Sequence, residues 1–121
     1  ITKKGIPFIN ENSDMKNALN VMTKKKLGVL IAINKNRFTT GIITDGQIRR
    51  SSQKNNNLKK LIVKNVMTRN PISIEKDTLA SKSLSIMSEK KITSLCVHKN
   101  GKKKITIGLL HLHALLKANI Q

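Results

Sequence analysis

The chain contains a long internal repeat, and this repeat constrains the fold more than any other feature of the sequence. Residues 9–27 match residues 74–92 at a constant shift of 65, and residues 41–50 match residues 108–117 at a shift of 67. Two residues are therefore inserted between the matching blocks of the second copy. Each copy alone is too short to bury a stable core, so we expect two similar modules that pack pseudo-symmetrically.

The length and composition of the chain bear on the class of protein. Its 121 residues contain no apolar run near the roughly 20 residues that cross a bilayer, so we expect no membrane insertion. Ile1 begins no secretory signal, and a chain that does not start with Met is interpreted as part of a longer protein. The single cysteine, Cys96, cannot form an internal disulfide, so we predict a cytoplasmic protein with Cys96 in its core.

The formal net charge of +18 raises the question of nucleic-acid binding. Lysine is spread over both copies of the repeat, however, and the only aromatic residues that could stack on bases are Phe8 and Phe38. We therefore expect salt-sensitive attraction to polyanions but no specific nucleic-acid partner. A basic nucleic-acid-binding domain is kept as the third alternative function.

Apolar periodicity and capping residues predict the same order of elements in both copies: strand, helix, strand, strand, helix. For the first copy the expected elements are strands at 8–9, 27–33 and 39–44, a helix capped by Ser13, and a short helix through residue 51 capped by Thr44 or Asp45. For the second copy they are strands at 72–74, 94–98 and 105–110, a helix capped by Thr78, and a last helix from Leu112.

These elements predict an α+β fold class. Two pseudo-symmetric β-α-β-β-α modules are expected at residues 5–59 and 72–121, with a connector at residues 60–71. Pro71 favours an extended conformation at the residue before it, and this directs the chain into the first strand of the second module.

Three phrases in the sequence resemble a known family. Asn65–Ile74, Lys91–Val97 and Gly41–Thr44 are similar to stretches of a tandem CBS (cystathionine β-synthase-type) pair, also called a Bateman module. The resemblance covers nearly the whole chain. It implies a nucleotide or related phosphate-bearing ligand in the clefts between the modules, no required cofactor, and disc-like dimers. We accordingly expect a homodimer, with a tetramer as an option for the parent protein.

Two further phrases are more specific. Gly41–Arg50 and Gly108–Lys117, the second with a His-x-His before the final helix, are similar to the C-terminal half of bacterial D-arabinose 5-phosphate isomerases. In that family a catalytic sugar-isomerase (SIS) half comes first. The family interconverts ribulose 5-phosphate and arabinose 5-phosphate for Kdo and lipopolysaccharide synthesis. The resemblance implies that this chain is the non-catalytic regulatory and oligomerisation module of such an enzyme.

The isomerase chemistry itself is not expected in this chain. Moving a carbonyl group between two carbons needs an acid and a base in one closed pocket. Of the six acidic residues only Asp45 lies in a recognisable motif, and no serine- and glycine-rich sugar-phosphate loop is present. We predict no catalytic residue. His111 and His113 would lie on the same side if the strand continued through both. We nevertheless predict no metal site, because His98 is distant in sequence and no carboxylate lies near.

The candidate ligand-binding residues gather where a strand ends and a helix begins. Thr44 and His111 each occupy such a junction, where the helix offers free N–H groups and a positive dipole to a phosphate. Arg49 and Arg50 lie on the first turns of one of these helices and can bind a phosphate in bidentate fashion, unless they form a solvated helix face. The full set of candidates is Thr44, Asp45, Gln47, Arg49, Arg50, Thr68, Thr93, Ser94, His111 and His113.

One departure from the family pattern bears on the ligand. Many adenosine-binding CBS modules have an Asp three residues after the junction Thr or Ser, where it holds the ribose hydroxyls, whereas this chain has Gln47 and Ala114. Gln47 can still hydrogen-bond a hydroxyl, but Ala114 cannot. We therefore expect a nucleotide or a nucleotide-sugar such as CMP-Kdo, a product of the same pathway, with AMP and ATP as the other ligands considered. An adenylate-sensing CBS pair of another protein is the alternative function.

Overall fold

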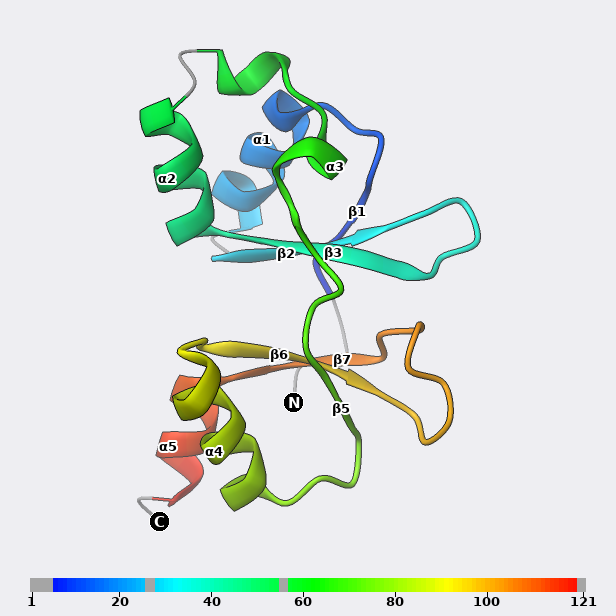
Figure 1. Cartoon of the computed structure of the whole chain (residues 1–121), viewed down its shortest axis with the longest axis vertical. Coiled ribbons are helices and arrows are strands. Elements are labelled where there is room, and N and C mark those ends of the chain that lie inside the picture. Colours follow the sequence, from blue (N-terminus) through cyan, green and yellow to red (C-terminus); the bar gives the residue numbers. More distant parts are fainter. Residues whose placement is uncertain (1–5, 26–27, 55–56, 120–121) are drawn as a thin grey trace. The chain divides into compact units, whose positions relative to one another are not determined.

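The computed structural model describes residues 6–25, 28–54 and 57–119. The expected strand start at Leu27 and the expected module limits at Gly5 and Gln121 lie outside these residues. The described chain separates into two compact units (Figure 1). The first unit is Pro7–Pro71, and the second unit contains Ile6 and the described residues from Ile72 onward.

The first unit is a four-stranded sheet with its helices on one face (Figure 1). Its elements are β1 Phe8–Asn10, α1 Met15–Lys25, β2 Val29–Ile33, β3 Thr39–Thr44, α2 Asp45–Lys54, the 3₁₀ helix η1 Leu58–Lys60, α3 Val63–Val66 and β4 Thr68–Arg69. The strand order is β1-β2-β3-β4, in which β1 is parallel to β2 and the other neighbours are antiparallel. The parallel pair requires a crossover connection, and α1 provides it.

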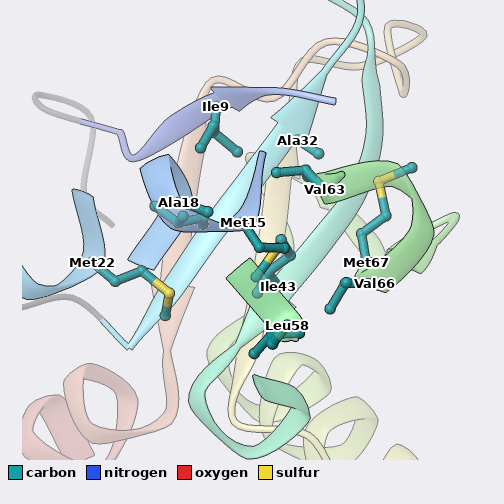
Figure 2. Packing of buried hydrophobic residues seen from close by; sticks show 11 residues of the cluster. Ile9, Met15, Ala18, Met22, Ala32, Ile43, Leu58, Val63, Val66 and Met67 are labelled. Atoms are coloured by element: carbon teal, nitrogen blue, oxygen red, sulfur yellow. The ribbon is translucent and has the colours of Figure 1, made fainter. Parts of the chain in front are cut away.

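The core of the first unit forms where the apolar stripe of α1 meets alternate side chains of the sheet. Met15 and Ala18 recur at helical spacing and are fully buried in one cluster with Leu30 and Ile43. Figure 2 shows Met15 at the centre of this cluster, beside Ile43. Successive strand residues point to opposite faces, so Leu30 and Ala32 share the helix-covered face of β2.

The second unit is a three-stranded sheet with two helices on one face. Its elements are β5 Ser73–Glu75, α4 Ala80–Lys90, β6 Ser94–His98, β7 Gly108–His111 and α5 Leu112–Asn119. The strand order is β5-β6-β7, with the first pair parallel and the second antiparallel. Its buried cluster consists of Ile74, Met87, Leu95, Val97, Leu110 and Leu115. Both units thus contain strand, helix, strand, strand, helix, and the predicted α+β fold class is confirmed.

The predicted helix caps at Ser13 and Thr78 are wrong. The α1 cap is Asp14, whose Oδ1 accepts a hydrogen bond from the Asn17 N–H at 2.8 Å. The Ser13 backbone instead belongs to a turn, in which its N–H donates to the Asn10 carbonyl at 3.0 Å, and its own carbonyl accepts a bond from the Val63 N–H at 2.8 Å. The N-cap of α4 is Leu79, which makes no side-chain capping bond, so α4 is held by its packing rather than by a cap.

The segment predicted as a connector carries structure that the sequence did not reveal. Residues 58–69 form η1, α3 and β4, and the side chains of Val63, Val66 and Met67 are buried in the core of the first unit. The Met15 N–H donates to the Leu61 carbonyl at 2.8 Å, which ties α1 to this segment. The module boundaries themselves stay a prediction.

The last strand is shorter than predicted. It begins at Gly108 rather than at Ile105, because the residues before it form turns, with the Ile105 N–H bonded to the Lys102 carbonyl at 3.1 Å. Within the described ranges, no helix has both the length and the apolar character needed to span a bilayer.

Candidate functional site

The two strand-to-helix junctions, β3–α2 and β7–α5, share one backbone arrangement. The Asp45 N–H at the start of α2 donates to the Gly28 carbonyl at 3.1 Å. The Leu112 N–H at the start of α5 donates to the Thr93 carbonyl at 2.8 Å. In the sequence repeat, Gly28 is equivalent to Thr93, and Asp45 is equivalent to Leu112. Both helices therefore start at the same place, beside the beginning of the first strand of the hairpin. The first N–H groups of a helix lack intrahelical acceptors, and each junction therefore carries positive potential.

Thr44 and Asp45 form the first junction. Thr44 caps α2, since its Oγ1 accepts a hydrogen bond from the Gln47 N–H at 3.3 Å. Of the two predicted caps, the structure thus selects Thr44. The Asp45 carboxylate is exposed and lies close over Gly28, where an added Cβ would be 3.1 Å from its Oδ2. The hydroxyl of Thr44 is consequently engaged in the fold, and the Asp45 carboxylate extends toward the start of β2.

Arg50 is the arginine that reaches this junction. Its Nη1 would lie 3.3 Å from a Cβ placed on Gly46, so the side chain runs back along α2 to the first turn. Arg49 and Arg50 are both exposed. The guanidinium of Arg50 thus adds a cation to the positive end of the helix, which is the chemistry that a phosphate group requires.

The amide nitrogen of Gln47 is bonded within the fold. Its Nε2 donates to the Val66 carbonyl at 2.6 Å, which joins α2 to the C-terminal end of α3. Gln47 also borders a hollow of about 330 Å³ beside α2, whose other lining residues are Arg50, Ser51, Gln53 and Lys54. The amide nitrogen is used in this bond, and the amide oxygen is the group left to accept a hydrogen bond from a ligand hydroxyl.

Thr68 lies on the edge strand of the same sheet. It is exposed and pairs with Ile42, two residues before Thr44 on β3. The first unit therefore brings Thr44, Asp45, Gln47 and Arg50 to one junction, with Thr68 on the neighbouring strand. Among the described residues, no contact places Arg49 there.

The second junction is built on a serine–histidine pair. Ser94 and His111 face each other across β6 and β7, and Ser94 Oγ lies 3.0 Å from His111 Nδ1. β7 ends at His111, so His113 belongs to α5 and is exposed, and the two histidines do not share a strand face. Thr93 is exposed and contributes its carbonyl to the start of α5. In the part of the chain that the structure describes, no three His, Cys, Asp or Glu residues are arranged to hold a metal ion.

Acidification is expected to destabilise the fold through His111. Burial lowers the pKa of the His111 imidazole below its ordinary value of 6.5, and the nearby charge of His113 lowers this pKa further. Between the lowered value and the ordinary one, the unfolded chain binds a proton that the folded chain does not. The free energy of unfolding therefore falls as the pH drops through this window. Urea denaturation between about pH 7.5 and about pH 5.5 should show the loss, and His111→Gln should reduce it.

An NMR titration of the imidazole signals provides the direct check. The His111 ring should titrate with a midpoint below 6.5. His113→Gln is the control, because it removes the neighbouring charge but keeps the Ser94–His111 pair, and it should bring the midpoint only part of the way back. A His111 midpoint at or above the ordinary value would contradict the expectation.

The second sheet has a polar face that was not predicted from the sequence. Ser73 Oγ and His98 Nδ1 are hydrogen-bonded, and His98 is buried. Cys96 lies on the same face and is buried as expected; burial raises the pKa of its thiol to about 11, although a hydrogen bond with Thr106 partly offsets this. The signal was present in the repeat, because the equivalents of Ser94, Cys96 and His98 in β2 are Val29, Ile31 and Ile33.

One family model matches the chain. It is described as the CBS domain, and it matches residues 1–54 and 63–120. Arabinose 5-phosphate isomerase KdsD of Escherichia coli (strain K12) is 31% identical over 115 residues, which make up 95% of this chain and 34% of that protein. The chain therefore spans about a third of the length of the curated relatives that it matches.

Solved structures share the fold. CBSX2 of Arabidopsis thaliana, in complex with AMP, has a TM-score of 0.84 at 21% identity, over 100% of this chain and 92% of that chain. The CBS domain pair of protein MJ0100, in complex with 5′-methylthioadenosine and S-adenosyl-L-methionine, has a TM-score of 0.85 at 20% identity, over 100% and 94% of the two chains. At these identities the likeness concerns the fold alone.

Proposed function

Because this chain belongs to the CBS domain family, we propose that it is a non-catalytic regulatory and oligomerisation module that binds a nucleotide or a nucleotide-sugar. We assign it to an arabinose 5-phosphate isomerase that acts in the cytoplasm, with a sugar-isomerase (SIS) domain upstream in the same chain. The similarity to KdsD over 95% of this chain supports that assignment. The module forms a homodimer in this proposal, and a tetramer is an option for the parent protein.

The position of Arg50 is the observation that carries the binding proposal. Its guanidinium lies at the first turn of α2, beside the Thr44–Asp45 junction, so a phosphate placed there meets a cation and a helix N-terminus together. A nucleotide-sugar such as CMP-Kdo also carries the hydroxyl groups that the Gln47 amide oxygen can accept from. Ligand binding at the junctions would bias the conformation of the module, and the attached enzyme domain would respond to that bias.

An adenylate sensor is the second candidate function. It is favoured by the ligands bound in the two similar structures, AMP in one and adenosine-containing molecules in the other. It is disfavoured by Gln47 and Ala114, which stand where a carboxylate would hold the ribose. The two candidates therefore differ in the base and sugar that the site prefers, while both require a phosphate or another charged group at the junction.

Thermal denaturation with AMP, ATP, CMP and CMP-Kdo tests the proposal, because a ligand that binds the folded state raises the denaturation midpoint. CMP-Kdo should give the largest rise. Arg50→Gln should weaken its binding by about tenfold, since a charge-assisted contact is lost. Arg49→Gln is the matched control, with the same change of charge one residue away, and it should weaken binding by less than about threefold.

The outcomes separate the candidates. A rise with AMP or ATP and none with CMP-Kdo would favour the adenylate sensor. Equal losses in the two arginine variants would show that net charge, rather than the position of Arg50, governs binding. No rise with any of the four ligands would remove the nucleotide-binding proposal.

A further inference from the structure

The two residues that break the internal repeat lie in one loop of the second unit. β2 and β6 correspond at a shift of 65 residues, and β3 and β7 correspond at a shift of 67. The insertion therefore falls in the connection between β6 and β7, residues 99–107. By the repeat its counterpart is residues 34–40, of which Thr39 and Thr40 already belong to β3. We call residues 99–107 the lysine loop. Its two extra residues have no counterpart in the first copy, whose fold forms without them.

The lysine loop concentrates positive charge. It carries Lys99, Lys102, Lys103 and Lys104 and no acidic residue, whereas the shorter loop of the first unit carries Lys35 and Arg37. Residues 99–104 are all exposed. A compact group of exposed cations attracts an anionic surface much more strongly than the same charges spread over the molecule.

The loop is held in a defined shape. The Lys102 N–H donates to the Lys99 carbonyl at 2.9 Å, and the Ile105 N–H donates to the Lys102 carbonyl at 3.1 Å, so two turns follow each other. Gly101 has a φ of 78°, which a glycine adopts without strain. At the base of the loop, Thr106 is buried and hydrogen-bonded to Cys96, and the Ile107 N–H donates to the Val97 carbonyl at 2.7 Å.

An apolar side chain accompanies these lysines. Ile105 is 40% exposed and directly follows Lys104, at the end of the second turn. Lysines beside an exposed aliphatic residue match the boundary between lipid headgroups and acyl chains, where cations meet phosphates and the apolar group enters the bilayer surface. A site that recognises single-stranded bases would instead use aromatic stacking groups, and the lysine loop has none. We propose that the lysine loop docks the protein on an anionic lipid surface through Lys99, Lys102, Lys103 and Ile105.

Within the second unit, the lysine loop is separate from the strand-to-helix junction. The lysine loop leads into β7 at Gly108, and the second junction lies at the other end of β7, at His111. The three residue steps between them correspond to roughly 10 Å of strand. Changes in the lysine loop should therefore leave the second junction unaltered. Vesicle binding and nucleotide binding are measured separately, so the failure of one proposal would not decide the other.

Co-sedimentation of the full chain with phosphatidylcholine vesicles that contain about one-third phosphatidylglycerol tests the docking. Each lysine near an anionic surface contributes about fivefold in affinity, so the triple variant Lys99→Gln, Lys102→Gln, Lys103→Gln should bind about 100-fold more weakly. The matched control is Lys82→Gln, Lys90→Gln, Lys117→Gln, which removes the same charge from exposed helix positions of the same unit. It should lose less than about fivefold.

Ile105→Ser distinguishes a lipid surface from other polyanions. It should weaken vesicle binding by about fivefold, because partial burial of an aliphatic side chain is lost, and should leave binding to polyuridylic acid unchanged. Thermal melts verify that each variant is folded. Equal losses in the two lysine triples would overturn the proposal in favour of binding by net charge. A fall in polyuridylic acid binding that matches the fall in vesicle binding of Ile105→Ser would overturn it in favour of a nucleic-acid surface.

Discussion

Replacing Gly41 with valine is expected to destabilise the first unit by about 3 kcal/mol, because overpacking a well-filled site against backbone costs this much. A Cβ at Gly41 would lie 2.9 Å from the carbonyl oxygen of Thr68 and would overlap the side chain of Met67. The Met67 side chain can move, but the Thr68 carbonyl belongs to β4, which pairs with β3 at this point. Urea denaturation should show the loss in the free energy of unfolding, and the melting temperature should fall by roughly 10 °C.

Gly46→Ala is the control, and it should raise the free energy of unfolding rather than lower it. A Cβ on Gly46 would meet only the end of the Arg50 side chain, at 3.3 Å, and this flexible group can shift. Gly46 lies in the first turn of α2, where alanine favours the helix by up to about 1 kcal/mol. If Gly41→Val were as stable as the unaltered protein, the close approach of β4 to β3 would not exist in solution.

The periodic part of the fold was predictable from the sequence, because apolar spacing reports burial directly. β2, β3 and β6 are found close to where alternating or continuous apolar residues predicted strands, and the internal repeat predicted the order of elements in both units. The short elements of the connecting segment were not predictable. A four-residue helix such as Val63–Val66 is too short to show a helical period. Its first N–H groups bond to the carbonyls of Ser13 and Glu11, in the turn before α1 and far away in the sequence.

The helix caps show a different limit of prediction from the sequence. Ser13 and Thr78 are residue types that favour N-caps, but adjacent residues compete for that position and tertiary contacts decide between them. Asp14 caps α1 because the backbone of Ser13 is held by the Val63 N–H. In the second unit the helix starts at Ala80, so Thr78 lies outside the cap position.

The candidate site was predictable by residue type but not by geometry. The strand-to-helix junctions were found from the repeat, and Thr44 indeed caps α2. The sequence could not distinguish Arg49 from Arg50, because they are neighbours in α2. Only the direction of the side chain shows which of them reaches back to the first turn of the helix. It also could not show that Gln47 is bonded to Val66, since that contact joins two segments that are distant along the chain.

Ala114→Asp is expected to raise the affinity for AMP by about 10- to 100-fold, because two ribose hydroxyls would donate to a charged acceptor. Ala114 is exposed on the first turn of α5, so a carboxylate fits there and is favoured by the helix dipole. Isothermal titration calorimetry with AMP measures the change, and Ala114→Asn, which fits the same space without a charge, should gain much less. Gln47→Asp would test the other junction less cleanly, because it breaks the bond to Val66 at a cost of about 1 kcal/mol. If folded Ala114→Asp binds AMP no better than the unaltered chain, the second junction does not hold a ribose.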